Sequence, residues 1–196
     1  MPHLDPLLRF VSMTHQLRQV KRAIYVKGED QLENDCEHQY QLTLVAWYLV
    51  QSHHLDLDLD KVIRYALVHD LVEVYAGDID TFAKDKSMKK ENERLAAIRL
   101  QSEFPEFGDL HATIAAYESK LDKESRFVHA LDKILPTINN FLDDGRTWKK
   151  RGITFEMVKE SKRGKINQHP LVEELFEDLA QRISQKEREL FPLVVD

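Results

Sequence analysis

Residues 65–79 read Tyr-Ala-Leu-Val-His-Asp-Leu-Val-Glu-Val-Tyr-Ala-Gly-Asp-Ile, an apolar stretch interrupted by a few ionisable residues. Together with the residues just before it, the stretch carries apolar side chains at helical spacing on more than one side, which is typical of a helix at the centre of a bundle. Gly77 is a natural end for that helix, because glycine adopts the left-handed backbone that helix C-termini often need. The sequence therefore predicts a central helix over residues 60–76.

Three side chains in this stretch bring an imidazole and two carboxylates to a helix that is otherwise suited to burial. Glu73 follows His69 by four residues and Asp70 by three, so a helix places all three on one surface. Unpaired buried carboxylates are costly. A divalent ion resolves that cost, because imidazole nitrogen and carboxylate oxygen suit zinc, manganese, iron, cobalt and related metals. Asp78 comes directly after the predicted helix end, where the helix dipole does not stabilise a carboxylate, so we expect another use for it.

Helical periodicity continues on both sides of this stretch. Asn34 with Glu37 three residues later forms a capping-box pattern, which predicts a helix with His38 in its first turn. The apolar positions assigned to that helix are Tyr40, Leu44, Val45, Tyr48 and Leu49. A second long helix is expected over residues 124–142, bent at Pro136 and with Asp132 inside it.

The fold class follows from these helical patterns and from the absence of a β-strand pattern. Residues 5–20 and 169–190 also show helical spacing of apolar residues. No stretch shows sustained alternation of apolar and polar residues with β-branched enrichment. The sequence therefore predicts an all-α protein, a single helical bundle, and no repeat or flexible linker divides the chain into two domains.

Composition excludes several classes of function. The 196 residues include 28 Lys and Arg against 34 Asp and Glu, and the formal net charge of −6 argues against binding to nucleic-acid polymers or anionic membranes. The longest uninterrupted apolar stretch, residues 44–50, is too short to cross a bilayer. Cys36 is the only cysteine, and the first ten residues lack the pattern of an export signal, so we expect a cytoplasmic protein.

A metal ion needs more ligands than His69 and Asp70 supply. His38 and Asp132 are the other histidine and carboxylate that lie near a predicted helix core. They are far from the central stretch in sequence, and no local motif fixes their meeting. Spacing alone therefore leaves open that His38 is a hydrogen-bonded core residue and that Asp132 forms an ion pair. Cys36 and the pair His53-His54 are interpreted as structural.

Taken in order, Glu37-His38, His69-Asp70 and Asp132 resemble the H…HD…D pattern of the HD-domain phosphohydrolases, an all-α superfamily. Residues 69–79 resemble the HDxxExxxGDI segment of its 5'-deoxynucleotidase group, and the resemblance covers about residues 17–142. It implies a bundle of the HD-domain type in which His38, His69, Asp70 and Asp132 hold one divalent ion. Manganese, cobalt, zinc, iron, nickel and magnesium all remain candidates for that ion.

The resemblance also implies roles for residues around the metal. Arg22 falls where the family has an arginine that contacts the substrate phosphate, although in this sequence the family's R-x-G-W segment reads Arg-Ala-Ile-Tyr and Tyr25 replaces the tryptophan. Arg22, Tyr25 and Asp78 are thus expected to bind substrate. Glu73 is expected to be catalytic and to handle protons for the attacking water or the leaving oxygen.

The implied activity is metal-dependent hydrolysis of nucleoside 5'-monophosphates, with 2'-deoxynucleotides preferred, to nucleoside and phosphate. One alternative is another HD-type phosphohydrolase that acts on guanosine polyphosphates, cyclic dinucleotides or triphosphates. Another is a non-catalytic module that binds a metal or nucleotide, against which the intact Glu73 and Asp78 argue.

We expect one HD domain over residues 1–196, with the helices of 150–196 packing outside the metal-site core. Because the family commonly forms dimers, a homodimer can be expected. The apolar stripe of Leu171, Leu175 and Leu179 either serves that contact or completes the core of the monomer.

Overall fold

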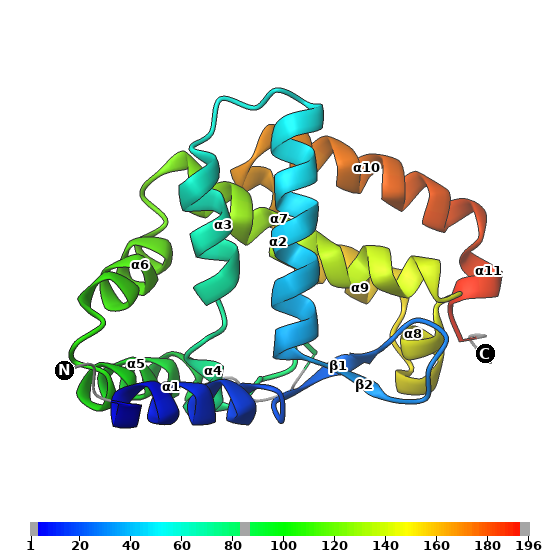
Figure 1. The fold of residues 1–196 in the computed structure, drawn as a ribbon. Coiled ribbons are helices and arrows are strands. Elements are labelled where there is room, and N and C mark those ends of the chain that lie inside the picture. The colour runs from blue at the N-terminus through cyan, green and yellow to red at the C-terminus, as the bar shows by residue number, and fades with distance from the viewer. Residues whose placement is uncertain (1–3, 83–86, 193–196) are drawn as a thin grey trace.

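The computed structural model of the chain describes residues 4–82 and 87–192, which form a helical bundle with one small β-hairpin (Figure 1). The elements in chain order are α1 (Leu4–Leu17), β1 (Lys21–Tyr25), β2 (Leu32–Asn34), α2 (Asp35–Ser52), α3 (Leu59–Val68), α4 (Glu73–Ala76), α5 (Lys89–Glu103), α6 (Gly108–Ser119), α7 (Lys123–Leu142), α8 (Arg146–Arg151), α9 (Phe155–Lys162), a single 3₁₀ turn (Ile166–Gln168), α10 (Pro170–Gln185) and α11 (Glu187–Leu190). The prediction of an all-α fold class is confirmed.

Helix α7 lies at the centre, with α2 and α3 crossing it on one side and α10 packed along it (Figure 1). The side chains at the crossing are fully buried, among them Leu42 of α2, Val62 of α3, and Phe127 and Leu131 of α7. A second apolar cluster joins α1, α5 and α6 to the α3–α4 region. Since α7 contacts the N-terminal and the C-terminal helices alike, a polar group on it faces several elements at once.

Helix α2 begins where the capping box predicts, but it turns a different face to the core. The side chain of Asn34 accepts a hydrogen bond from the Glu37 amide, and the Glu37 side chain accepts one from the Asn34 amide. The buried face carries Leu42, Ala46, Leu49 and Val50, whereas Tyr40, Leu44 and Tyr48 of the predicted stripe are exposed. Residues 42–50 are apolar apart from Thr43, so periodicity cannot select the side that is buried.

The predicted central helix over residues 60–76 is interrupted at its polar residues. Helix α3 ends at Val68, and the next turn is held by hydrogen bonds between residues three apart, from the Leu71 amide to the Val68 carbonyl and from the Glu73 amide to the Asp70 carbonyl. This tighter winding has 3₁₀ character, which a four-residue stretch of sequence does not reveal. Helix α4 then ends at Gly77, whose φ of +74° fits the predicted glycine end.

The hairpin of β1 and β2 is a feature that the sequence did not predict. The strands pair antiparallel, with Lys21 opposite Asn34. Their connection is tied to the α7–α8 region: the Gly28 amide donates to the Asp143 carboxylate, and the Arg146 guanidinium donates to the carbonyls of Val26 and Glu29. Strands of five and three residues are too short for recognisable alternation, and these contacts come from a distant part of the chain.

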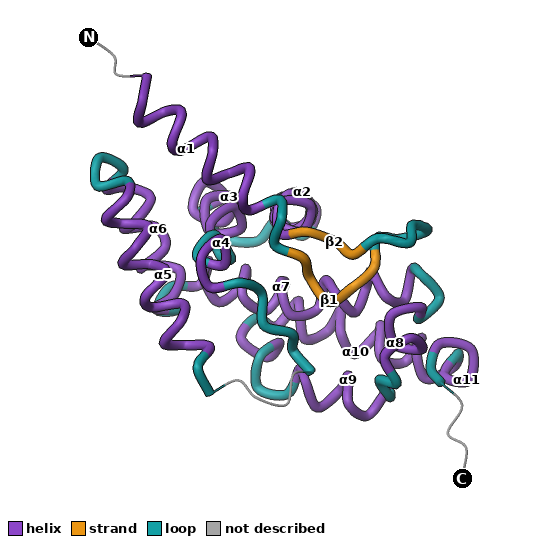
Figure 2. Tube along the Cα trace, turned by 90° about the horizontal axis from the view of Figure 1, so that it is seen from below, coloured by secondary structure: helices purple, strands orange, loops and turns teal. Residues whose placement is uncertain are grey.

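The C-terminal helices belong to the same core as α2, α3 and α7, although the sequence analysis places them outside it. Trp148, Val158, Phe176 and Ile183 are buried in the main apolar cluster. In the stripe predicted on α10, Leu179 is buried, and Leu171 and Leu175 are half-buried. Leu175 packs against the main cluster, so the stripe helps to complete the core of the monomer. Figure 2 shows α8, α9 and α10 gathered beside α7.

Over residues 4–82 and 87–192, the longest and most apolar helices still fall short of what a membrane crossing requires.

Candidate metal centre and adjoining pocket

The structure brings the four predicted ligand residues together from three parts of the chain. His38 comes from the first turn of α2, His69 and Asp70 from the turn between α3 and α4, and Asp132 from α7. One ligand atom of each lies within 4.8 Å of the others. His38 Nε2 is 3.0 Å from Asp132 Oδ1, and His69 Nε2 is 2.9 Å from Asp70 Oδ2. Buried carboxylates such as Asp132 need compensating positive charge.

His69 is oriented as a ligand by its own helix. Its Nδ1 lies 3.0 Å from the Ala66 carbonyl oxygen and donates a hydrogen bond to it, so Nε2 is the ring nitrogen that faces the cluster. Nε2 is buried and has no hydrogen-bond partner among the described residues, despite its closeness to Asp70. A second hydrogen bond that fixes the ring is a common feature of metal-binding histidines. The donor set of two imidazoles and two carboxylates fits a divalent ion.

Arg22 projects from β1 into this cluster and contacts its carboxylates. Its guanidinium lies 2.8 Å from Asp70 Oδ2, 3.3 Å from Asp35 Oδ1 and 4.0 Å from Asp132 Oδ1. Burial lowers the pKa of Arg22, but Asp70 and Asp132 outweigh that effect and raise it. Arg22 is therefore a fixed positive charge at the edge of the cluster.

Glu73 stands beside the four residues and is itself almost completely buried. Burial, followed by the charges of Asp70 and Asp78, raises its pKa to about 10. Its Oε2 has no hydrogen-bond partner among the described residues, and Lys89 lies 3.8 Å from Oε1. A carboxyl group with a raised pKa is suited to proton transfer near neutral pH.

Sequence reasoning missed Asp35, which is fully buried in the first turn of α2. Burial and Asp70 raise its pKa to about 7. Oxygen atoms of Asp35, Asp70 and Glu73 also lie within 4.8 Å of one another, so a second acidic group adjoins the first. The signal in the sequence was a carboxylate between the predicted helix cap, Asn34, and the predicted ligand His38.

Lys133 is a second residue that sequence reasoning missed. Its ammonium group pairs with Oδ2 of Asp132, the residue before it. Burial raises the pKa of Asp132, but Lys133 and the two histidines outweigh that effect and hold it well below the usual range. Asp132 is therefore kept ionised, as a metal ligand must be.

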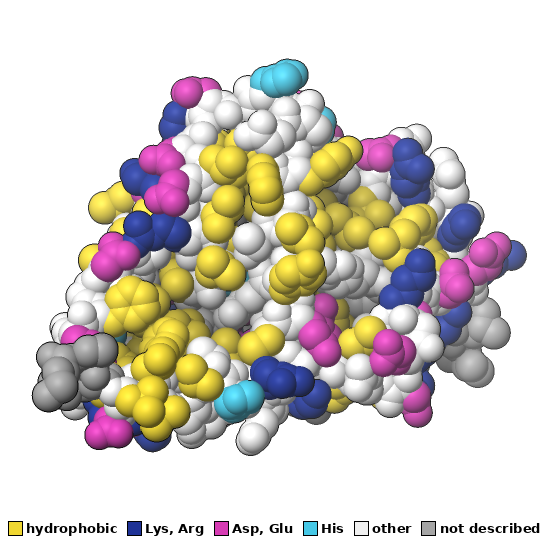
Figure 3. All heavy atoms as spheres, viewed as in Figure 1, with side chains coloured by type: hydrophobic (Ala, Val, Ile, Leu, Met, Phe, Trp, Pro, Cys, Tyr) yellow, Lys and Arg dark blue, Asp and Glu magenta, His cyan; other side chains and the backbone are white. Residues whose placement is uncertain are grey.

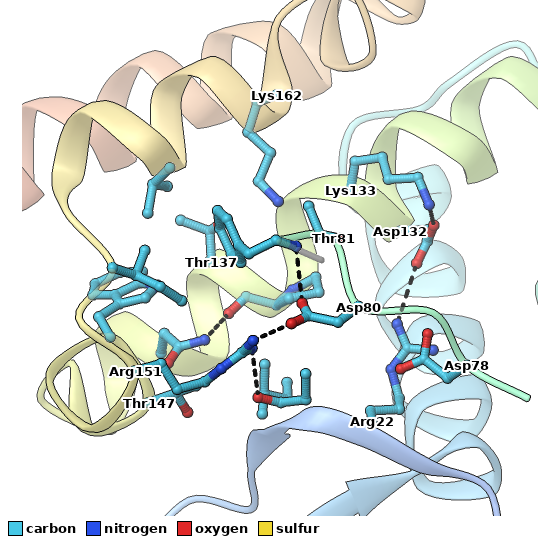
Figure 4. A pocket seen from close by; sticks show the side chains of 18 residues that line it. Arg22, Asp78, Asp80, Thr81, Asp132, Lys133, Thr137, Thr147, Arg151 and Lys162 are labelled. Atoms are coloured by element: carbon cyan, nitrogen blue, oxygen red, sulfur yellow. Dashed lines mark hydrogen bonds and ion pairs between the residues drawn. The ribbon is translucent and has the colours of Figure 1, made fainter. Parts of the chain in front are cut away.

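A pocket opens beside the cluster and extends toward α8 and α9 (Figure 4). Arg22, Asp78 and Asp132 line its end nearest the cluster. Asp78 is half-buried, and burial raises its pKa, an effect that Arg22 opposes. Asp80 forms an ion pair with Arg151 on another wall.

Tyr25 is the one predicted substrate-binding residue that the structure does not bring to this pocket. Ala23 and Ile24 line the pocket, whereas the Tyr25 ring packs against the cations of Lys150 and Arg146, 4.1 and 4.8 Å from its centre. Contact between Tyr25 and a substrate stays a prediction from the sequence, and this arrangement does not support it.

Comparison with known proteins finds a match to the model of the HD domain family over residues 14–175. The chain is 30% identical to the mouse 5'-deoxynucleotidase HDDC2 over 131 residues, which are 65% of this chain and 64% of the mouse protein. It is 29% identical to the Saccharomyces cerevisiae 5'-deoxynucleotidase YBR242W over 67% of this chain and 58% of that protein. The matches thus span a little under two thirds of the length of these relatives.

Two solved structures resemble the fold. The crystal structure of a predicted metal-dependent phosphohydrolase from Magnetospirillum magnetotacticum superposes with a TM-score of 0.81 at 29% identity, covering 96% of both chains. A conserved hypothetical protein from Pyrococcus furiosus superposes with a TM-score of 0.58 at 19% identity, over 88% of this chain and 98% of that one, which is a likeness of fold.

Proposed function

This chain belongs to the HD domain family, and on that premise we propose that it is a metal-dependent phosphomonoesterase that hydrolyses nucleoside 5'-monophosphates, with 2'-deoxynucleotides preferred. The observation that carries the proposal is the convergence of His38, His69, Asp70 and Asp132 to within 4.8 Å, beside a pocket with an arginine at its near end. The 5'-deoxynucleotidases among its relatives support the substrate class.

The four residues would hold the divalent ion, which would supply a water of lowered pKa and neutralise phosphate charge. Glu73 would give its proton to the leaving 5'-oxygen and later recover one from the water. Arg22 would offer two parallel N–H donors to the phosphate oxygens, in place of part of its contact with Asp70 and Asp35. Asp78 would accept a hydrogen bond from a sugar hydroxyl.

The activity is tested by measuring phosphate release from ribo- and deoxyribonucleoside 5'-monophosphates with added Mn²⁺, Co²⁺, Mg²⁺, Ni²⁺, Fe²⁺ or Zn²⁺ and in metal-free buffer. Controls are 3'-monophosphates and guanosine tetraphosphate. We expect metal-dependent cleavage of the 5'-deoxynucleotides that disappears in His69→Ala together with bound metal, because the variant loses a ligand. No release from any 5'-monophosphate by protein that contains metal would refute the nucleotidase proposal.

A homodimer is part of the proposal, and an exposed apolar face supports it. Tyr40, Leu44, Trp47 and Tyr48 of α2 and Leu67 of α3 are all exposed. Figure 3 shows hydrophobic side chains gathered on this side of the molecule and continuing toward the helices below. An apolar patch that spans several helices is unusual on a monomer and suits a symmetric contact between two copies.

We expect light scattering after size exclusion to give a dimer mass for the wild type and a monomer mass for Trp47→Glu, because the charge would be buried at the contact. Leu121→Glu is the matched control, since Leu121 is also exposed but lies in the connection between α6 and α7. A monomeric wild type, or an equal response of both variants, would refute a dimer through this face.

A cytoplasmic location, which the single free Cys36 supports, is likewise proposed.

A further inference from the structure

Lys162 is the last residue of α9, and its side chain extends into the pocket rather than toward solvent (Figure 4). Only 6% of the residue is exposed. Lysine is almost never buried to this degree without a partner, because burial of an unpaired ammonium group is costly. This residue therefore calls for a specific explanation.

The ammonium group of Lys162 makes no hydrogen bond and no ion pair with residues 4–82 and 87–192. The charges that act on it are mainly repulsive: Lys133 and Lys165 disfavour its charged form, and Asp132, which favours it, is already paired with Lys133. Burial is the largest influence and, with Lys133, lowers the pKa of Lys162 to about 7. Lys162 is thus a donor without an acceptor, directed into a binding cavity.

The position of Lys162 within the pocket indicates which part of a substrate it meets. Arg22, Asp78 and Asp132 stand at the end where the phosphate is proposed to bind, and Figure 4 shows Lys162 on a different wall, apart from all three. The pocket residues from α8 onward include the apolar side chains of Trp148, Ile153 and Val158, and polar side chains such as Thr137 and Asn140 of α7 also line the pocket. A pocket that joins apolar surface to a few polar groups can hold a planar organic ring and fix its orientation.

We propose that Lys162 is a specificity-determining residue that donates a hydrogen bond to an oxygen acceptor of the nucleobase. This inference rests on the proposed function only in assuming that a nucleotide is the ligand, with its phosphate at the metal end. The nucleobase would thus provide the hydrogen-bond acceptor that Lys162 does not find among residues 4–82 and 87–192. A hydrogen bond to a charged group strengthens binding by roughly tenfold to a hundredfold.

The test is equilibrium binding measured by calorimetry in the Glu73→Gln background, where turnover is expected to be strongly slowed, with Mn²⁺ present. The ligands are the deoxynucleoside 5'-monophosphates and 2-deoxyribose 5-phosphate, which has the phosphate and the sugar but no base. We expect Lys162→Met to raise the dissociation constant of the best-bound nucleotide about tenfold or more and to reduce the differences among bases. Binding of 2-deoxyribose 5-phosphate should stay unchanged.

Two further measurements separate this role from a structural one. Lys162→Met should not lower the melting temperature, because methionine keeps the apolar stem and removes an uncompensated charge. Lys165→Met is the matched control: Lys165 lies three residues on and does not line the pocket, so nucleotide binding should not change. Kinetics with otherwise wild-type protein should show the Lys162→Met effect in KM, with kcat within about threefold.

The inference is overturned if Lys162→Met leaves the affinity for every nucleotide unchanged, or if it weakens 2-deoxyribose 5-phosphate as much as the nucleotides. The second result would place Lys162 on the phosphate or the sugar. Failure of the proposed function has a different signature: nucleotides would bind with the Lys162 dependence described, yet no phosphate would be released by protein with an intact Glu73.

Discussion

Glu73→Gln is expected to lower kcat for a deoxynucleoside 5'-monophosphate by roughly 10²–10⁴-fold, the usual contribution of a positioned acid or base. The amide has the same shape as the carboxyl group but cannot transfer its proton to the leaving oxygen. Elemental analysis should still find one ion per chain, because the proposed ligands His38, His69, Asp70 and Asp132 are all intact in this variant. Steady-state kinetics on metal-loaded protein provides the measurement.

The leaving group distinguishes the proton role of Glu73 from a structural one. 4-Nitrophenyl phosphate expels a stable phenolate that needs no protonation, so Glu73→Gln should slow its hydrolysis far less than that of a nucleotide. Glu118→Gln is the control, since Glu118 is exposed on α6 and the same change there should have no effect. Equal losses with both substrates would contradict the acid role, and survival of nucleotide turnover within severalfold would contradict any proton role.

Gly145→Ala is expected to destabilise the fold more than alanine at any other glycine of the chain. Gly145 precedes α8 with a φ of +69°, and a Cβ built on it would overlap the backbone carbonyl of Leu190. Left-handed backbone costs a non-glycine residue about 1–2 kcal/mol, and overpacking adds about 1–3 kcal/mol. At roughly 2–4 °C per kcal/mol, the melting temperature should fall by roughly 4–20 °C in a thermal unfolding experiment.

Gly152→Ala separates the cost of left-handed backbone from the cost of overpacking. Gly152 follows α8 with a similar φ of +64°, but a Cβ there would meet no atom within 4 Å. It should lower stability by the backbone cost alone, about 1–2 kcal/mol. If the two variants are destabilised equally, the close approach of the C-terminal segment to Gly145 contributes nothing to stability.

The sequence was sufficient to predict the local features of the fold. The capping box of Asn34 and Glu37, the glycine end at Gly77 and the helical class all depend on residues a few positions apart, where backbone chemistry decides the outcome. The face that α2 buries was not predictable, because its apolar run leaves several sides equally suited to burial until neighbouring helices are placed.

In the candidate site, too, the features that depend on distant parts of the chain could not be predicted from local sequence. His38 and Asp132 are 94 positions apart, and no spacing rule joins them, so the resemblance to a family was needed to predict that they meet. Asp35 was missed because its partner, Arg22, comes from the hairpin. The strands of that hairpin are too short to recognise in the sequence, so nothing predicted that Arg22 would lie beside Asp35. Lys162 was missed because an isolated lysine at the end of a helix ordinarily faces water.

The hairpin that carries Arg22 has a consequence for the order in which the protein is made. The ribosome has synthesised every candidate metal ligand once residue 132 is complete, but Asp143 and Arg146, which bind the turn of the hairpin, are synthesised later. Residues 26–29 must therefore wait for partners more than a hundred positions downstream, a slow, non-local closure. A nascent chain that stops between residues 132 and 143 contains all four candidate metal ligands. The hairpin that carries Arg22, the proposed phosphate-binding residue, is not yet anchored in such a chain.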